Sequence, residues 1–267
     1  GTWLAAFPSP LFVFVSFTLT AVFFLGFSRG GVGERARGTL VLLNVATALT
    51  FLCFFYALKL IEPAIVGAVE IGIGPVLAVL LTLMLTGARP SSTRIVVCVG
   101  ILCGCGILAA AALQGSGFAS FGLSAWFGLG ASAAAGLGAV LITMASKALI
   151  GKGWQFGAVL AHRFYLILPI SLALSVTTGV DGIEWSEGLS MSLVVVSIVG
   201  VLAPLYLLQI GIGKCDPYTV MVTMSALPVL TFAIEGFSPL YSWSWLTAFG
   251  LAVVTAFLMI DVVAKKS

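Results

Sequence analysis

The chain has 267 residues, of which 61% are apolar and 8% are charged, and its net charge is +3. A soluble domain carries charge on roughly 25% of its residues, so this composition excludes a soluble globular protein. The net positive charge does not indicate a nucleic-acid-binding protein either, because basic and aromatic residues are not interleaved as in nucleic-acid-binding surfaces.

A helix that crosses a membrane needs about 20 apolar residues, and nine stretches of this chain meet that requirement. Apolar and polar residues do not alternate along them, so the pattern predicts an all-α membrane protein and not a β-barrel. No linker divides the chain, and we expect one membrane domain over residues 1–267. In chain order the stretches are Pro10–Phe27, Thr39–Ile61, Pro63–Thr86, Ile95–Leu113, Phe121–Leu149, Trp154–Thr178, Met191–Gly213, Pro217–Gly236 and Tyr241–Ile260.

The loops between these stretches differ in charge. Cytoplasmic loops carry an excess of lysine and arginine, and one alternate set of loops holds most of the 12 basic residues. This pattern predicts a cytoplasmic C-terminus and places the acidic loop 181–187 outside. The basic residues of this set of loops are Arg29, Arg35, Arg37, Arg89, Arg94, Lys147, Lys152, Lys214, Lys265 and Lys266.

Nine spans with the C-terminus inside place Gly1 outside, although the chain begins Gly-Thr-Trp and has no signal peptide. The simplest explanation is a tenth helix that precedes Gly1.

An internal repeat also indicates ten helices. An acidic residue followed by proline (Pro63 and Pro217) opens two helices, and each carries a second proline near mid-membrane (Pro75 and Pro228).

Matched helices of this repeat lie five spans apart and therefore run in opposite directions. The sequence thus predicts a ten-helix inverted-repeat (5+5) bundle, of which nine spans are in this chain. The first repeat is expected over 1–114, without its first helix, and the second over 118–267.

Prolines inside helices have a consequence for the backbone, because proline has no N–H and frees a carbonyl one turn earlier. We expect such breaks at Pro75 and Pro228, and also at Pro169 and Pro204. They persist in a membrane only where protein or a watery cavity satisfies the backbone. A packed kink and a substrate site explain them equally well.

Small residues recur at four-residue spacing in two stretches, namely Gly128, Ser132 and Gly136, and Gly100 and Gly104. This spacing is typical of close helix packing in membranes. We assign it to contacts within one bundle and expect a monomer.

Ten spans in two inverted repeats, with an acidic-Pro pair and a second proline in the fourth helix of each, resemble the drug/metabolite transporter superfamily. The bacterial EamA-type members are most similar, over Tyr56–Arg89 and Lys214–Glu235. Arg163 matches an arginine that the family often carries in the second helix of a half, but Ser16 stands at that position in the first half. The family's frequent carboxylate after the fourth helix is absent from the first half.

This resemblance implies a secondary carrier of the bacterial inner (plasma) membrane that works by alternating access and needs no cofactor. It implies export of small metabolites, and the similarity to aromatic amino acid exporters suggests aromatic or neutral amino acids. The expected partners are this substrate and the lipid bilayer. Five cysteines and one histidine show no metal-ligand spacing, so no metal is expected.

Ionisable residues inside a membrane helix are costly and indicate function. Glu70 and Arg163 lie at depths that leave a gap of under about 10 Å between them along the membrane normal. We expect them to pair as a gate or to bind the two charged groups of a zwitterion. A static ion pair, or a Glu70 that snorkels outward, is the alternative.

Further polar residues lie within the apolar stretches. His162 shares a helix face with Tyr165 and is a candidate for a coupling proton, or a structural residue held by hydrogen bonds. Interhelical hydrogen bonding explains the remaining candidates equally well. They are Asn44, Tyr56, Tyr206 and Gln209.

Two other classes of protein remain as alternatives. A channel or facilitator for small solutes is the first, although it favours repeated rings of polar residues. An intramembrane enzyme is the second, because Ser132 and His162 faintly resemble the Ser/His dyad of rhomboid proteases. Ser132 lies in a run of small residues, so helix packing explains it better.

Overall fold

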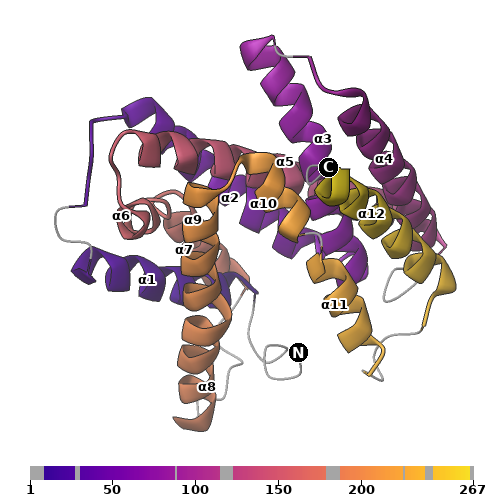
Figure 1. The fold of residues 1–267 in the computed structure, drawn as a ribbon. Coiled ribbons are helices and arrows are strands. Elements are labelled where there is room, and N and C mark those ends of the chain that lie inside the picture. Colours follow the sequence, from indigo (N-terminus) through magenta and orange to yellow (C-terminus); the bar gives the residue numbers. More distant parts are fainter. Residues whose placement is uncertain are drawn as a thin grey trace. The chain divides into compact units, whose positions relative to one another are not determined.

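The computed structural model describes residues 9–27, 31–87, 89–114, 123–178, 187–224, 226–237 and 243–264. Every regular element in these ranges is a helix (Figure 1). Six helical segments of this described part are long and apolar enough to cross a membrane. The chain is therefore all-helical, and its long segments are those of a multi-pass membrane protein.

The long segments are α1 (Ser9–Phe27), α2 (Arg37–Ala57), α3 (Pro63–Thr86), α4 (Ser92–Leu113), α5 (Leu123–Gly151) and a run made of α8 (Glu187–Ser197), the π-helical turn η2 (Ile198–Leu202) and α9 (Ala203–Lys214). The other helices are α6 (Phe156–Ala161), α7 (Ile167–Thr178), α10 (Pro217–Met224), α11 (Ala226–Glu235) and α12 (Trp245–Ala264). The expected orientation partly depends on residues that lie outside the described ranges, namely Arg29, Asp181, Glu184, Lys265 and Lys266.

Two expected spans each comprise two helices. The stretch Trp154–Thr178 contains α6 and α7, and Pro217–Gly236 contains α10 and α11. The expected helix starts at Pro63 and Pro217 are confirmed, since α3 and α10 begin at these prolines. Proline suits the first helical position because no intrahelical acceptor is lost there.

The prolines differ in their effect on the backbone. Only Pro75 lies deep inside a described helix, α3. The expected break at Pro169 is found, since the span Trp154–Thr178 is interrupted just before this proline. Pro169 is the third residue of α7, where the missing N–H has no partner within the helix. Pro228 holds the same position in α11. Pro204 is the second residue of α9. Ala203 directly follows η2, and its N–H donates to the carbonyl of Ile198, five residues back.

The chain forms two compact units. Unit 1 comprises Gly1–Ala48 and Leu141–Cys215, and unit 2 comprises Leu49–Val140 and Asp216–Ser267. Each unit contains segments of both expected repeats. The boundaries between the units therefore differ from the boundary between the repeats, which was expected near residue 115. The repeat itself stays a prediction.

In unit 1, α1 packs against α6 and α7 and also against α8 and η2. Ser16 of α1 and Ser197 of α8 are fully buried and share a hydrogen bond of 2.8 Å between their hydroxyls. The two hydroxyls thus satisfy each other inside an apolar unit. An apolar cluster that includes Leu43, Leu149 and Val159 joins the beginning of α2 to the end of α5 and to α6.

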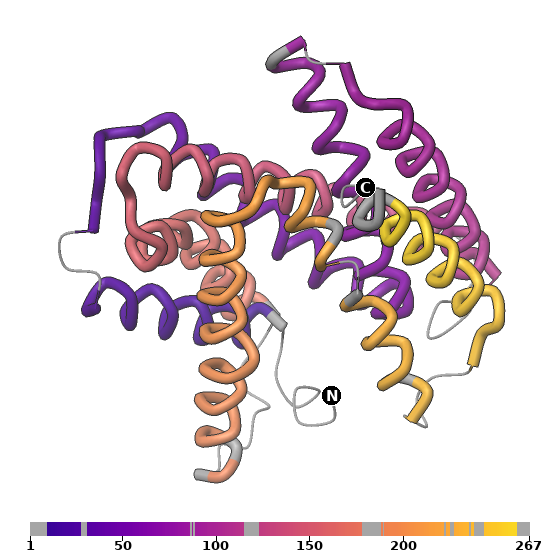
Figure 2. The backbone as a smooth tube through the Cα atoms, viewed as in Figure 1, coloured from indigo at the N-terminus to yellow at the C-terminus, as the bar shows by residue number. Residues whose placement is uncertain are grey.

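In unit 2, α4 and α12 lie side by side although they are far apart in the sequence, and α3 packs against both (Figure 2). Glycines permit this approach. A Cβ at Gly100 would overlap the ring of Phe257, and one at Gly104 would lie 3.1 Å from the backbone nitrogen of Val254. The prediction that these two glycines pack within one bundle is confirmed.

The small residues of α5 pack in the same way. A Cβ at Gly128 would lie 3.0 Å from Ile61, and one at Gly136 would lie 2.5 Å from the carbonyl oxygen of Glu70. Ser132, between them, is fully buried. This stripe of α5 is therefore in contact with the end of the α2–α3 turn and with α3.

Substitution of Gly136 tests this contact. Gly136→Ala is expected to cost about 1–3 kcal/mol, because backbone and not a flexible side chain opposes the new methyl group. Gly130→Ala on the same helix is the control: its Cβ meets nothing within 4 Å, so the change should be neutral or stabilising by up to about 1 kcal/mol. Thermal unfolding in detergent measures both. Equal effects would show that α3 does not approach α5 as described.

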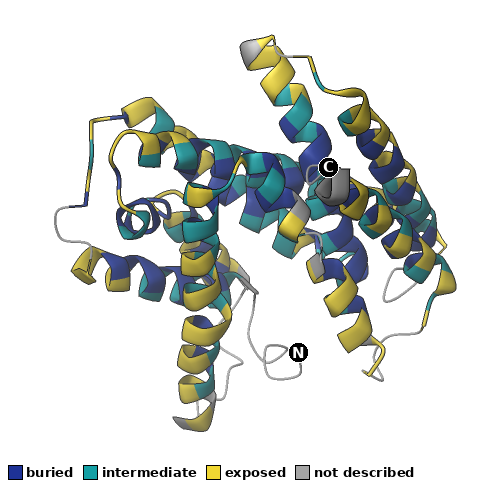
Figure 3. Ribbon diagram, viewed as in Figure 1, coloured by how far each residue is buried: buried dark blue, intermediate teal, exposed yellow. Residues whose placement is uncertain are grey.

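Large apolar side chains are exposed on both units, and α8 in particular is exposed along most of its length (Figure 3). Within an 18-residue stretch of the span Ser190–Lys214, 11% of the residues are buried, against 33–50% in the corresponding stretches of the other five spans. Exposed apolar surface on this scale is unfavourable in water. Lipid contact accounts for it.

Candidate functional site

The helical stretch after Trp154 is interrupted inside unit 1. Helix α6 ends at Ala161 and α7 begins at Ile167, and Arg163 lies between them with 2% of its surface exposed. The N–H of His162 closes α6 by donating to Ala158, and Phe164 accepts from Leu168 at the start of α7. In membrane transporters, interrupted helices place polar backbone and side-chain groups at a binding site.

Two contacts orient the Arg163 guanidinium. Its Nε donates to the hydroxyl of Thr47 at 3.4 Å, and its central carbon lies 5.4 Å from the centre of the Phe164 ring. A cation over an aromatic face is stabilised by about 0.5–2 kcal/mol. Both partners belong to unit 1, whereas Glu70 belongs to unit 2, so a pair between Glu70 and Arg163 stays a prediction.

Asn44 of α2 supports the interruption. Its side-chain nitrogen donates to the carbonyl of Leu40 at 3.0 Å and to that of His162 at 2.9 Å. The second bond satisfies a carbonyl at the end of α6, which has no partner within the helix. Asn44 therefore holds the end of α6 in place.

His162 links the interruption to a neighbouring pocket. Its Nδ1 hydrogen-bonds the hydroxyl of Tyr165, and its ring meets that of Trp154 edge-on at 5.7 Å between centroids. Trp154 in turn donates its indole N–H to the carbonyl of Glu34 at 3.0 Å. The sequence placed His162 and Tyr165 on one helix face. They are in contact, but both lie in the interruption and not in a helix. The contact of His162 with Trp154 was not expected.

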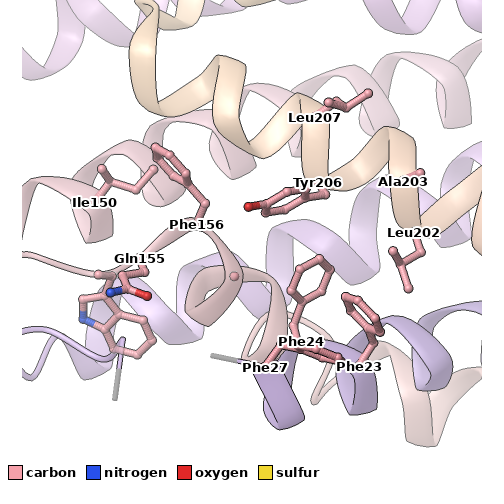
Figure 4. Close-up of a pocket in the computed structure, with 12 residues that line it drawn as sticks. Phe23, Phe24, Phe27, Ile150, Gln155, Phe156, Leu202, Ala203, Tyr206 and Leu207 are labelled. Atoms are coloured by element: carbon pink, nitrogen blue, oxygen red, sulfur yellow. The ribbon is translucent and has the colours of Figure 1, made fainter. Parts of the chain in front are cut away.

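A pocket of about 850 Å³ opens beside Trp154 (Figure 4). It lies between the end of α1, the turn from α5 to α6, and α9. The Tyr206 ring projects from α9 into the space between Phe156 and Phe24, and its centroid lies 5.2 Å from that of Phe24. We call it the aromatic pocket, because six of its lining residues are aromatic: Phe23, Phe24, Phe27, Trp154, Phe156 and Tyr206.

The composition of the aromatic pocket determines what it can bind. Its volume is within the range of about 300–1,000 Å³ that small-molecule sites occupy. None of its lining residues is charged, and Gln155 supplies the one side-chain amide among them. The pocket therefore suits an uncharged ring or chain, which aromatic faces bind by stacking.

Gln209 lies behind the wall of the aromatic pocket. It falls within about 60° of Tyr206 and Gly213 on the surface of α9, and a Cβ at Gly213 would meet the ring of Phe156. The Gln209 side chain is fully buried, and neither of its amide atoms has a hydrogen-bond partner among the described residues. An unsatisfied buried amide costs about 1–3 kcal/mol, so a role beyond folding is expected.

Substitution by leucine distinguishes the two buried amides. Gln209→Leu is expected to raise stability by about 1–3 kcal/mol, because it removes unsatisfied polar atoms, and to lower transport if the amide meets a ligand. Asn44→Leu should lower stability, because it leaves the carbonyl of His162 without a donor. Removal of the Asn44 Oδ1, which is buried without a partner among the described residues, offsets part of this loss. Thermal unfolding together with uptake measures both. A loss of stability in Gln209→Leu would show that its amide has partners.

The structure places the candidates as follows. Five of the seven polar candidates lie in unit 1, where Tyr206 lines the aromatic pocket, Gln209 lies behind it, and Asn44, His162 and Arg163 surround the interruption. Tyr56 and Glu70 lie in unit 2.

Sequence reasoning missed most of the pocket. Phe23, Phe24 and Phe27 were read as part of an apolar span, and Phe156 was not singled out. The three- and four-residue spacing of the α1 phenylalanines was the available signal, since it places them on one helix face.

Comparisons with known proteins point to the fold. No protein-family model and no curated protein sequence matches the chain. A solved crystal structure superposes with a TM-score of 0.72, and the match covers 98% of this chain and 89% of the other. The two chains are 20% identical, so this likeness shows a shared fold and no shared function.

Proposed function

We propose that the chain is a secondary carrier for small metabolites and a member of the drug/metabolite transporter superfamily. The observation that carries this proposal is the interruption between α6 and α7. The buried Arg163 lies in it, and the neighbouring His162 contacts Trp154, which lines a pocket of small-molecule size. Interrupted helices around a polar site are typical of secondary transporters. An ionisable residue inside an apolar span points the same way.

Aromatic or neutral amino acids are the substrates that we propose. The aromatic pocket suits the side chain of such a molecule, but its lining residues carry no charge to meet an ammonium or a carboxylate. The guanidinium of Arg163 is proposed to bind the carboxylate in the substrate-bound state, since arginine pairs with carboxylates through two parallel hydrogen bonds.

For the architecture, we propose ten helices in two inverted repeats of five, in the bacterial inner membrane with a cytoplasmic C-terminus. Charge in the loops supports this orientation. Single cysteines introduced at Arg35 and at Asp181 test it with an impermeant thiol reagent. Labelling at 35 from the cytoplasmic side and at 181 from the outside is expected, and the reverse pattern would refute the orientation.

The function is tested with purified protein in liposomes and a panel of labelled amino acids, nucleosides and sugars. Saturable uptake of phenylalanine or another neutral amino acid is expected, with inhibition by related molecules. Flux that rises in proportion to concentration for every solute would indicate a channel instead. Saturable uptake of another class only would keep the carrier and refute the substrate.

A further inference from the structure

Glu70 is the charged residue of α3, since the helix from Pro63 to Thr86 contains no other. It is the eighth residue of this apolar helix and is partly buried. No hydrogen bond or ion pair to a described residue of unit 2 engages its carboxyl group. Charges in such positions are costly and are kept where they serve transport.

The neighbours of α3 show where the Glu70 side chain points. A Cβ at Gly67 would lie 3.7 Å from Pro228 of α11, and one at Gly74 would lie 2.9 Å from the sulfur of Met221 of α10. With 3.6 residues per turn, Glu70 lies about 60° from Gly67 and about 40° from Gly74 around the helix. It therefore faces the side of α3 on which α10 and α11 meet.

The other flank of Glu70 is α5. Ile73 is also about 60° from Glu70 around the helix, in the opposite direction from Gly74. Its side chain lies 2.6 Å from the position of a Cβ at Gly136 of α5. Glu70 thus projects between α5 and the junction of α10 with α11, and all of these segments belong to unit 2.

Charged and titratable groups on the elements around α3 lie at helix ends or on other faces. From Leu123 to Val140, α5 contains no charged or titratable residue. Cys105 of α4 lies against Gly72, on the side of α3 that faces α4 and α12. Gly72 is about 160° from Gly74 around the helix. The hydroxyl of Thr247 lies 3.5 Å from the Glu62 carboxylate at the start of α3. The remaining groups are Arg94, which lies over the Tyr218 ring, Cys98 and Cys103 on α4, Glu235 at the end of α11, and Asp261 near the end of α12.

Backbone acceptors, in contrast, belong to the same stretches. Pro75 has no N–H and cannot donate to the carbonyl of Ile71. Met224 is the last residue of α10, so this helix supplies no donor to its carbonyl. A protonated carboxyl group can donate a hydrogen bond to such a carbonyl, whereas an ionised carboxylate only accepts. Loss or gain of one proton at Glu70 therefore changes whether its carboxyl group can donate a hydrogen bond to a backbone carbonyl.

We propose that Glu70 is the proton-binding site that couples this carrier to a proton gradient. The carboxylate takes up one proton from one side of the membrane and releases it to the other, and no other bond forms or breaks. A proton needs one oxygen atom, whereas a sodium ion is held by several oxygen ligands in such transporters. This inference rests on the proposed carrier function.

Transport in liposomes tests the coupling, with L-phenylalanine as the probe. Glu70→Gln is expected to lose accumulation driven by a pH gradient while exchange of labelled for unlabelled phenylalanine, without a gradient, persists. The control Glu34→Gln changes an exposed acid and should retain both activities. Accumulation by Glu70→Gln under a pH gradient, or accumulation by the unmodified protein that needs sodium, would overturn the proposal.

Infrared spectroscopy of the purified protein makes the test independent of transport. Each of the nine carboxylic acid side chains gains a C=O band when it takes up a proton, so spectra on acidification are compared between variants. One such band, present in the unmodified protein and in Glu34→Gln, is expected to be missing from Glu70→Gln and to appear in the difference spectrum. A difference spectrum without such a band would overturn the proton site even where exchange is observed. A carrier that exchanges nothing but shows the band would refute the substrate and retain the proton site.

Discussion

Ala203→Trp is expected to lower transport of phenylalanine about tenfold or more, because an indole in the aromatic pocket removes at least two ring contacts of about 0.5–1.5 kcal/mol each. Ala203 is exposed and lines this pocket from α9. The new side chain enters open space, so little change in thermal stability is expected. Initial rates of uptake over a range of phenylalanine concentrations measure the effect.

Val195→Trp is the matched control for this substitution. Val195 lies in the same membrane span and is 49% exposed, but it does not line the aromatic pocket. Its replacement should leave transport unchanged. Equal losses in both variants would trace the effect to the span as a whole, and normal transport by Ala203→Trp would remove the pocket from the transport path.

Arg163→Gln is expected to weaken the affinity for phenylalanine roughly 10- to 100-fold, because a hydrogen bond to a charged group is worth about 1.5–3 kcal/mol. Glutamine cannot supply the charge that the substrate carboxylate needs. The apparent affinity in uptake and in a thermal-shift assay measures the change. Phenylalaninol, which lacks the carboxylate, is the control substrate, and its transport should not respond to the substitution.

The same variant tests whether Arg163 and Glu70 form a pair. Arg163 already has Thr47 and Phe164 as partners in unit 1. We therefore expect the stability effects of Arg163→Gln and Glu70→Gln to add within about 0.5 kcal/mol. A double variant more stable than either single variant would instead show that each charge is stranded without the other, and would establish that Arg163 and Glu70 pair.

The helical class and most spans could be predicted from the sequence, because apolar length decides what crosses a membrane. The expected helix Pro63–Thr86 matches α3 at both ends. The interruption after Ala161 could be predicted only in part. Pro169 disfavours a helix that continues through Tyr165, but residues 162–166 contain neither glycine nor proline to mark where α6 ends. Side chains of α2 hold it in place, and those contacts arise only in the folded unit.

The candidate site could be predicted only in its polar part. Arg163 and Gln209 stood out because polar groups are rare in apolar spans. Phe24 and Phe156 did not, because aromatic residues are common wherever lipid or a core is contacted. Only the folded arrangement of α1, α6 and α9 distinguishes a pocket wall from a lipid-facing surface.

Counterflow in liposomes tests the carrier function most directly. The unmodified protein is reconstituted, the vesicles are loaded with unlabelled L-phenylalanine, and entry of a trace of labelled phenylalanine is followed without any ion gradient. A carrier that alternates between two sides is expected to accumulate label transiently above the outside concentration, and entry should saturate. Label that only equilibrates, at a rate proportional to its concentration and unaffected by internal phenylalanine, would contradict the account.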